Sequence, residues 1–516
     1  MGRSRWSEHN RMKNSIGWGI LVFLVSVRLS TAIAAADPVR GHYTWNPRLK
    51  AVYGQIMEFR LAEASSELAE ATRQDPRNLL ILHLENYVDF LRCYLDEDEG
   101  RFRQLESNKD SRIRRIREEG DATSPYHLYL QADILLQWAL ARLKYNDYTT
   151  AVLDANRAFR ILSTNQERFP DFLPNRKDLG ILKGIVGTIP ATYQQLLARF
   201  SRLQGTMEEA REDLRAALAA GPEGTYVYYP ETVVFLTFFQ LLLENDAAAA
   251  WRTVGKLTPS PERSPLTTYV KAQVALRTYR GDEAVRTLQN RPRGSRYHPL
   301  PYLEYMMGNA KLQRLDSDAD RHFRQFVLQF GGRQHLKDAH RKLAWHAWVV
   351  RQDSAAYFRH MAACRTAGRP DNGTDQEAHR QAGRSDLPAP ALLKARLLFD
   401  GGHFDRALAV LSDPSVRLHL MKPEERLEYT YRLGRIHHQD GRMEQAVQQY
   451  VRTLDEGADA PYYFACRAAL ELGNIHAVLG HYAAARRFYQ QCLRMEPQEH
   501  AMGLHQQAKA GLKRLP

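Results

Sequence analysis

The stretch PYYFACRAALELGNIHAVLGHYAAARRFYQQCLRMEP, Pro461 to Pro497, reads as two amphipathic helices joined by a short turn at Leu479-Gly480-His481. Apolar residues recur every three or four positions on both sides of that turn, which is the period of a helix with one buried face. Small residues at Gly473 and Ala485 lie where two antiparallel helices would approach each other, and the turn glycine permits a tight reversal. The stretch therefore predicts a helical hairpin.

The same arrangement recurs upstream at steps of 39 residues. Counted from Gly473, a turn glycine follows at +7, an alanine at +12 and a tyrosine at +16. The offsets recur from Gly434 (Gly441, Ala446, Tyr450) and from Ala395 (Gly402, Ala407, Leu411). Weaker matches occur around residues 64–76, 139–158, 272–288 and 307–323. The first residue of each set (Gly473, Gly434 or Ala395) is called the marker. We expect the marker and the alanine at +12 to let the two helices touch, and the residue at +16 to fill the groove toward the next pair of helices. A chain built in this way stacks each unit on its neighbours.

Leu-Gly on a first helix, Ala and an aromatic residue on a second, and a closing Pro resemble the tetratricopeptide repeat. The resemblance is specific for about 120 C-terminal residues and degenerate over the remainder. It implies an all-α fold, an α-solenoid of antiparallel helix-turn-helix repeats. The wider layout is similar to exported tetratricopeptide proteins of Bacteroidetes-type bacteria, through LLILHLENYVDFL, RFPDFLPNRKDLGILKGIVGTIP, HLKDAHRKLAWHAW and LLKARLLFDGGHFDRAL. That similarity implies an envelope location and no reaction.

The N-terminus has the order of a secretory signal peptide. Four basic residues precede the 13-residue apolar run SIGWGILVFLVSV, and Ala-x-Ala sites follow at Ala32/Ala34 and Ala34/Ala36. The run is shorter than the roughly 20 residues of a membrane span, and an uncleaved signal anchor is the alternative. Export to the periplasm or cell envelope is the predicted localisation.

The net charge and the number of cysteines bear on two questions, whether the protein binds nucleic acid and whether disulfides hold it together. Removing residues 1–34 takes away five basic residues and one acidic residue, which lowers the net charge from +13 by 4 to about +9. The basic residues are dispersed, so we expect no nucleic-acid partner. Four cysteines in 516 residues are not a disulfide framework. Cys466 and Cys492 fall at the ends of two helices that meet in a hairpin, where either a disulfide or two unpaired packing residues would fit.

We predict six segments from these patterns. They are a signal peptide (1–34), N-terminal repeats (35–166), an irregular helical region (167–254), degenerate repeats (255–364), a polar loop (365–390) and C-terminal repeats (391–516). The loop marks a soft boundary.

The inner face made by the first helices is the predicted binding surface for a protein partner, on the concave side of the array. Positions are counted along the first helix of each repeat, with the marker as position 8. The residues at positions 2, 5, 9 and 12 are expected to face the inner side of the array and to line the groove. The predicted groove residues are Leu392, Arg396, Phe399, Glu428, Tyr431, Arg435, His438, Arg467 and Asn474. Arg396, Arg435 and Asn474 share one offset and would form a polar ladder for a carboxylate or backbone carbonyls. The alternative is a solvated rim.

Neither the motifs nor the spacing of the 19 histidines indicates catalysis. The sequence lacks His-Glu-x-x-His, Cys-x-x-Cys and Gly-x-Ser-x-Gly, and we predict no catalytic residue, no cofactor and no metal ligand. The expected function is a protein–protein interaction scaffold at the cell envelope. The alternatives are an assembly factor that holds a client polypeptide, or a hydrolase or transferase with a site around residues 167–254. A cluster of His, Asp or Ser in a deep pocket there would favour the enzyme.

Overall fold

The computed structural model describes residues 40–186, 205–221 and 226–516. Regular structure in these residues is helical, apart from two isolated β-bridges that join Gly41 to Gly120 and His42 to Asn78. Residues Gly41–Pro516 form one compact unit. The predicted signal peptide, residues 1–34, lies outside the described residues.

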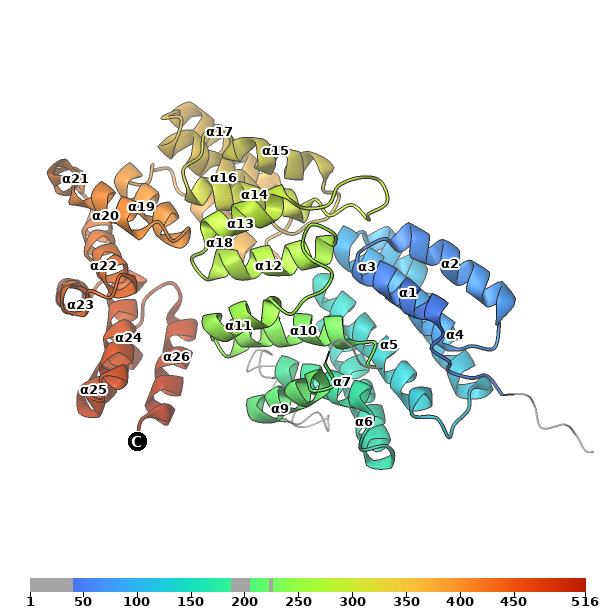
Figure 1. Ribbon diagram of the computed structural model, residues 1–516. Helices are drawn as coiled ribbons and strands as arrows, with labels where there is room; N and C mark the ends of the chain where they lie inside the picture. Colours follow the sequence, from blue (N-terminus) through green and yellow to red (C-terminus); the bar gives the residue numbers. More distant parts are fainter. Residues whose placement is uncertain (1–39, 187–204, 222–225) are drawn as a thin grey trace, which may run out of the picture. The chain divides into compact units, whose positions relative to one another are not determined.

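Helices follow one another along the whole unit (Figure 1). The first half contains α1 (Pro47–Met57), α2 (Leu61–Gln74), α3 (Leu80–Asp96), α4 (Glu99–Glu119), α5 (Pro125–Lys144), α6 (Tyr148–Arg168), α7 (Leu173–Val186), α9 (Met207–Leu218), α10 (Tyr229–Phe238), the π-helix η1 (Phe239–Leu243) and α11 (Ala247–Val254). The middle contains α12 (Pro265–Arg277), α13 (Gly281–Gln289), α14 (Tyr302–Gln313), α15 (Ala319–Gln329), α16 (Leu336–Val349), α17 (Ser354–Thr366) and α18 (Gly373–Ala382). The C-terminal part contains α19 (Pro390–Asp400), α20 (Phe404–Ser412), α21 (Pro414–His419), α22 (Pro423–Gln439), α23 (Met443–Gly457), α24 (Tyr463–Val478), α25 (Tyr482–Arg494) and α26 (Ala501–Arg514).

Successive helices pair as hairpins. Helix α5 packs against α6, α16 against α17, α22 against α23 and α24 against α25, and each pair also contacts the next helix along the chain. The turn glycines predicted for the last three repeats, Gly402, Gly441 and Gly480, have φ of 83°, 77° and 75°. Those angles lie in the left-handed region, where a side chain is strained. The predicted turns are confirmed.

Close packing explains the marker glycines. A Cβ built on Gly434 would lie 2.7 Å from the ring of Tyr450, and one on Gly473 would lie 2.5 Å from the ring of Tyr489. The aromatic residue at +16 therefore packs on the marker of its own hairpin, a contact that the sequence analysis did not foresee. Tyr489 also fits against Gly511 of α26, where an added Cβ would lie 2.5 Å from the ring. One tyrosine thus joins its own hairpin to the next helix.

The segment predicted as a polar loop, residues 365–390, contains helix α18. Asn372 caps this helix, because its side chain accepts the backbone N–H of Asp375 at 2.9 Å. The carboxylate of Asp375 is buried and in turn accepts the backbone N–H groups of His335 (2.6 Å) and Asp338 (3.0 Å). These bonds tie α18 to the start of α16, and polar composition alone did not reveal them.

A contact between distant segments is centred on Glu97, the left-handed C-cap of α3. Its side chain is 5% exposed and forms an ion pair with Lys144, whose Nζ lies 2.9 Å from the carboxylate. It also accepts the backbone N–H groups of Arg333 (3.1 Å) and Gln334 (3.0 Å), more than 230 residues further along the chain. A buried carboxylate is thus satisfied by two separate parts of the array.

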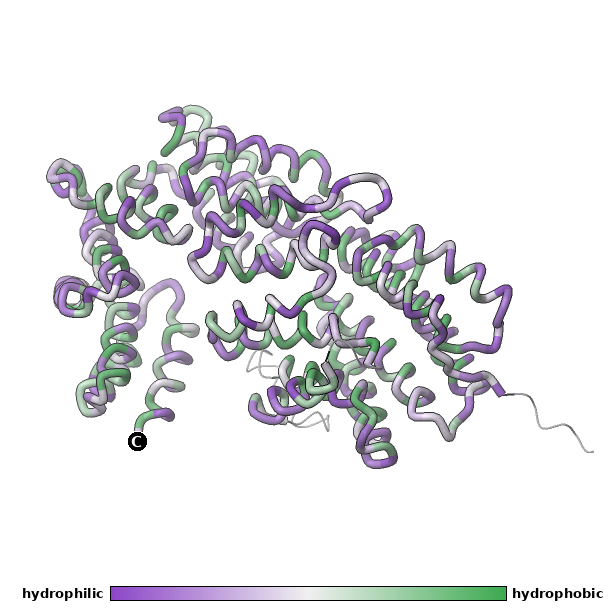
Figure 2. Tube along the Cα trace, in the orientation of Figure 1, coloured by the Kyte–Doolittle hydropathy of each residue, from purple (hydrophilic) through white to green (hydrophobic). Residues whose placement is uncertain are grey.

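Hydrophobic and hydrophilic residues alternate around the helices, as Figure 2 shows. Among the described residues, no helix combines the length and the apolar character needed to cross a membrane.

Candidate functional site

A groove of about 360 Å³ lies where α18, α19, α22 and α24 come together. Its apolar lining comes from Leu392 and Leu393 of α19 and from Tyr357 of α17, all at most 5% exposed. The first turns of α22 and α24 and the segment between α25 and α26 supply the rest of the lining. The groove is therefore built on the first helices of the C-terminal hairpins.

An aromatic group at the beginning of α24 forms one side of the groove. Tyr462, Tyr463 and Phe464 all line it, and the ring centroids of Tyr463 and Phe464 lie 4.4 Å apart. Phe464 is buried and packs against Tyr431 of α22, with centroids 5.6 Å apart. Burial raises the pKa of Tyr463 to about 12, so its hydroxyl keeps its proton at neutral pH. These rings offer an apolar surface that also carries hydrogen-bonding groups.

Ion pairs on the groove rim join its helices. Arg384 lies 2.7 Å from Glu424, and Lys422 lies 2.6 Å from Asp386, each measured from nitrogen to carboxylate oxygen. The side chains of both basic residues are about half exposed, at 53% and 44%. Exposed pairs of this kind contribute about 0–1 kcal/mol to stability. A charged group of a ligand can therefore replace one partner of either pair at little cost in free energy.

Arg396 is held differently from the rim residues. Its guanidinium lies over the ring of Trp345, 5.1 Å from the centroid, and 4.0 Å from the carboxylate of Asp400. The side chain is 38% exposed and lines the groove. Stacking on an aromatic ring fixes the plane of the guanidinium while its N–H groups remain directed outward. Arg396 can therefore bind a carboxylate or carbonyl oxygens of a ligand.

Two family models described as tetratricopeptide repeat match the chain, one over residues 392–461 and the other over residues 467–499. The chain carries tetratricopeptide repeats. A comparison with curated proteins finds no match. The matched ranges include most of α19 to α25, whose first helices supply part of the groove lining, while α18 and Tyr462–Phe464 lie outside them.

The structure brings three of the nine predicted groove residues into this groove, namely Leu392, Arg396 and Glu428. Phe399 and Tyr431 are instead core residues, 3% and 4% exposed. Phe399 contacts Arg435 of the next repeat and Tyr431 contacts Phe464 of the next repeat, so these two residues lie between repeats.

Two members of the predicted polar ladder, Arg435 and Asn474, have partners within the protein. Arg435 lies over Phe399, 4.1 Å from the ring centroid, and donates to the Tyr279 hydroxyl at 3.3 Å. Asn474 accepts a hydrogen bond from the Tyr489 hydroxyl at 2.9 Å. Arg396 and Arg435 each stack on an aromatic ring of another helix. Arg435 and Asn474 are thus engaged within the protein.

The two remaining predicted residues also have internal partners. The ring of His438 meets that of Tyr450 edge-on at 6.0 Å, and Arg467 pairs with Glu471 at 2.9 Å. Neither residue lines the groove.

The sequence analysis missed most of the groove. The missed residues come from α18 and the loop after it, from the N-terminal ends of α22 and α24, and from residues 498–500. Periodicity identifies the faces of helices, whereas this groove forms largely at helix ends. The polar composition of residues 365–390 was the available signal, and it was interpreted as a loop that marks a soft boundary.

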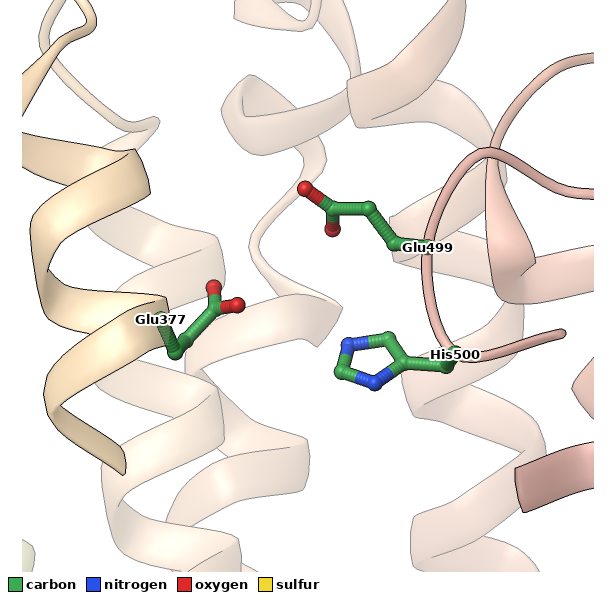
Figure 3. A group of neighbouring side chains, drawn as sticks. All are labelled: Glu377, Glu499 and His500. Atoms are coloured by element: carbon green, nitrogen blue, oxygen red, sulfur yellow. The ribbon is translucent and has the colours of Figure 1, made fainter. Parts of the chain in front are cut away.

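A group of potential metal ligands lies at one end of the groove. Glu377 of α18 faces Glu499 and His500 of the segment before α26 (Figure 3). One ligand atom from each lies within 4.8 Å of the others. Arg380 pairs with Glu377 and has its Nε 3.9 Å from Glu499. The two carboxylates therefore already share a cation, which ties α18 to the segment before α26.

A second concentration of charge surrounds Lys177 of α7, which is fully buried. Its ammonium nitrogen lies 2.7 Å from Asp178 Oδ1, 3.1 Å from Glu231 Oε2 and 3.4 Å from Asp133 Oδ1. His83 Nε2 lies 2.6 Å from the other oxygen of Asp133. We call these five residues the buried lysine cluster.

The pKa values of three groups in the buried lysine cluster are shifted in different directions. Burial opposes the charge of Lys177, but the surrounding carboxylates raise its pKa well above its ordinary value. Burial, together with the Asp133 carboxylate, raises the pKa of Asp178 well above its usual range. Asp133 is buried too, yet the Lys177 ammonium and the hydrogen bond with His83 hold its pKa below the ordinary value. The cluster thus favours the charged forms of Lys177 and Asp133 and the neutral form of Asp178.

The buried lysine cluster lies partly in residues 167–254, where a deep polar pocket would have favoured an enzyme. Lys177 and Asp178 are both 0% exposed, and Asp133 is 1% exposed. The ion pairs of Lys177 with Asp133, Asp178 and Glu231, and of His83 with Asp133, join α3, α5, α7 and α10. The described geometry of this cluster is that of a packing element between helices.

Proposed function

We propose that the groove binds an extended segment of a protein partner, and that the protein is a non-catalytic interaction scaffold of the cell envelope. The observation that carries the proposal is an open groove built on the first helices of matched tetratricopeptide repeats. It combines an apolar lining, an aromatic side and the stacked guanidinium of Arg396. Pockets of roughly 300–1,000 Å³ are typical of ligand sites, so about 360 Å³ accommodates a short peptide segment.

The chemistry of the lining indicates the nature of that segment. Tyr462 and Tyr463 would pack against apolar or aromatic side chains, while Arg396 would bind a carboxylate or successive carbonyl oxygens. The rim carries acids and bases in exposed pairs, so a partner with both signs of charge is accommodated. Export rests on the basic, apolar and small-residue order of residues 1–36.

Site-specific photocrosslinking tests the groove. A photoreactive amino acid replaces Gln498, which is exposed and lines the groove, in the full-length chain expressed in its native cells. The matched control replaces Gln448, an exposed glutamine of α23 outside the groove lining. We expect one dominant crosslinked polypeptide from position 498 that is absent from position 448 and is reduced by Arg396→Ala. Equal crosslinking from both positions, or none from either, would contradict the proposal.

Mass spectrometry of the mature N-terminus tests export separately. We expect a chain that begins after Ala34 or Ala36 and fractionates with the envelope. A chain that retains residues 1–34 and stays with cytoplasmic markers would refute the export proposal while leaving the groove untouched.

A further inference from the structure

The last matched hairpin brings two cysteines together. Cys466 lies in the first turn of α24, and Cys492 lies in the last turn of α25. Because the helices run antiparallel, these two ends meet, and the Sγ atoms are 3.5 Å apart. Both residues are buried, at 1% and 0% exposure.

Only a small movement separates these thiols from a covalent bond. A disulfide requires the sulfurs to approach to about 2.05 Å, which is about 1.5 Å closer than their present separation. The other two cysteines offer no such partner. Cys364 donates to the Ala378 carbonyl oxygen at 3.4 Å, and Cys93 is buried in a different hydrophobic cluster.

The electrostatics of the pair favour reaction at one sulfur. The hydrogen bond from Cys492 lowers the pKa of Cys466, whereas the same bond and burial raise the pKa of Cys492. The thiolate is the nucleophile in disulfide exchange, and in the paired geometry Cys466 is the sulfur that favours this form.

We propose that Cys466 and Cys492 form a disulfide that fastens α24 to α25. The oxidant is a disulfide, either a small molecule such as oxidised glutathione or a protein dithiol–disulfide exchanger. One of the two cysteines, as its thiolate, attacks one sulfur of the oxidant, forms a mixed disulfide and releases the other sulfur as a thiolate. The second cysteine loses its proton and attacks the cysteine sulfur of that mixed disulfide, which releases the remaining sulfur of the oxidant. Two electrons pass to the oxidant, and the two cysteine protons end on its two thiols.

Burial determines when this bond forms. Neither sulfur is accessible in the folded hairpin, so exchange takes place during folding or while α24 and α25 are transiently apart. Once formed, the bond closes a loop of 26 residues and restricts reopening.

The bond also fixes part of the groove, a consequence that rests on the proposed function. The turn that carries Cys466 carries Tyr463 and Phe464, and the segment after α25 carries Gln498 and His500. Joining α24 to the end of α25 holds these two parts of the groove lining at a fixed separation.

Differential alkylation of the full mature chain tests the bond directly. The protein is refolded in a glutathione buffer rich in the oxidised form, unfolded without reductant, alkylated and analysed by mass spectrometry. We expect Cys93 and Cys364 to be alkylated, while the peptides containing Cys466 and Cys492 are joined with a loss of two hydrogens. Alkylation of all four cysteines would overturn the proposal.

Proteolysis of the last hairpin tests the fastening. We expect cleavage within α24 and α25 to be on the order of 100-fold slower in the oxidised protein than after treatment with dithiothreitol. The double variant Cys466→Ala/Cys492→Ala should show no effect of reductant, and Cys364→Ser should retain the full effect. A disulfide that forms without slowing cleavage would refute the fastening. Neither result depends on whether the groove binds a partner.

Discussion

Replacing Lys177 by methionine tests the electrostatic account of the buried lysine cluster. Methionine keeps an unbranched apolar chain but removes the ammonium that lies 3.4 Å from Asp133 and 3.1 Å from Glu231. Both carboxylates then lose their cation in a region closed to solvent. The substitution therefore isolates the charge more than the volume.

The expected loss of stability follows from two limits. Two unit charges about 3 Å apart attract by about 5 kcal/mol at an effective dielectric constant of 20, and removing one partner of a buried pair costs about 3–5 kcal/mol. An unpaired aspartate can instead bind a proton, which at pH 7 costs about 4 kcal/mol because its ordinary pKa is about 3.9. We expect Lys177→Met to lower the free energy of unfolding by about 4 kcal/mol at pH 7.

The pH dependence has a definite sign. Without Lys177, the folded-state pKa of Asp133 rises above its unfolded value, so the variant regains stability as the pH falls toward that unfolded value. The recovery is about 1.4 kcal/mol per pH unit for one carboxylate. The deficit relative to the wild type should therefore be about 3 kcal/mol smaller at pH 5 than at pH 7.

Hydrogen exchange followed by mass spectrometry, corrected for intrinsic rates, measures the opening free energy of α5 and α7 peptides in both proteins. The matched control is Arg452→Met, which removes an exposed pair with Glu456. It should change stability by less than about 0.5 kcal/mol at either pH. A Lys177→Met deficit below about 1 kcal/mol, or one that does not change with pH, would refute the reasoning.

Four further substitutions, one of them a control, test packing, stacking and burial. Gly473→Ala should lower the urea-unfolding free energy by about 1–3 kcal/mol, because the new Cβ would lie 2.5 Å from an aromatic ring; Gly503→Ala, with nothing within 4 Å, should raise it by up to about 1 kcal/mol. Arg435→Met removes the guanidinium from the face of Phe399 and should lower the opening free energy of α22, measured by hydrogen exchange, by about 1–2 kcal/mol. Burial lowers the pKa of His335 to about 4, so its imidazole should remain neutral in an NMR titration down to about pH 4. Because this folded-state pKa lies below the unfolded value of about 6.5, the free energy of unfolding should decrease as the pH falls from about 6.5 to about 4. The variant His335→Asn should lack up to about 3 kcal/mol of this decrease.

The sequence predicted the repeat pattern because that pattern depends on local rules. Glycine at Gly441 and Gly480 meets a need for positive φ, and a small residue at Gly473 meets a steric need, so each is visible from spacing alone. Helix α18 was not foreseen, because its stability comes partly from the buried Asp375 carboxylate accepting backbone N–H groups of a distant segment.

The groove was predicted less well than the fold. Arg396 was identified from its register and does line the groove. Phe399 and Arg435 were identified by the same register, yet they stack on each other between repeats. Register determines which side of a helix a residue occupies but not whether another helix covers that side. Helix ends such as those carrying Glu424 and Tyr463 meet only in the assembled array.

The buried Glu97 carboxylate makes the stability of the N-terminal helices depend on the middle of this repeat protein. A solenoid whose units contact only their neighbours can be shortened from one end, and the remaining units fold as before. Glu97 instead draws two of its hydrogen bonds from Arg333 and Gln334. A chain that ends before residue 333 would keep the ion pair of Glu97 with Lys144 but would lose both N–H donors to this buried carboxylate. Its first helices would therefore be less stable than they are in the complete array.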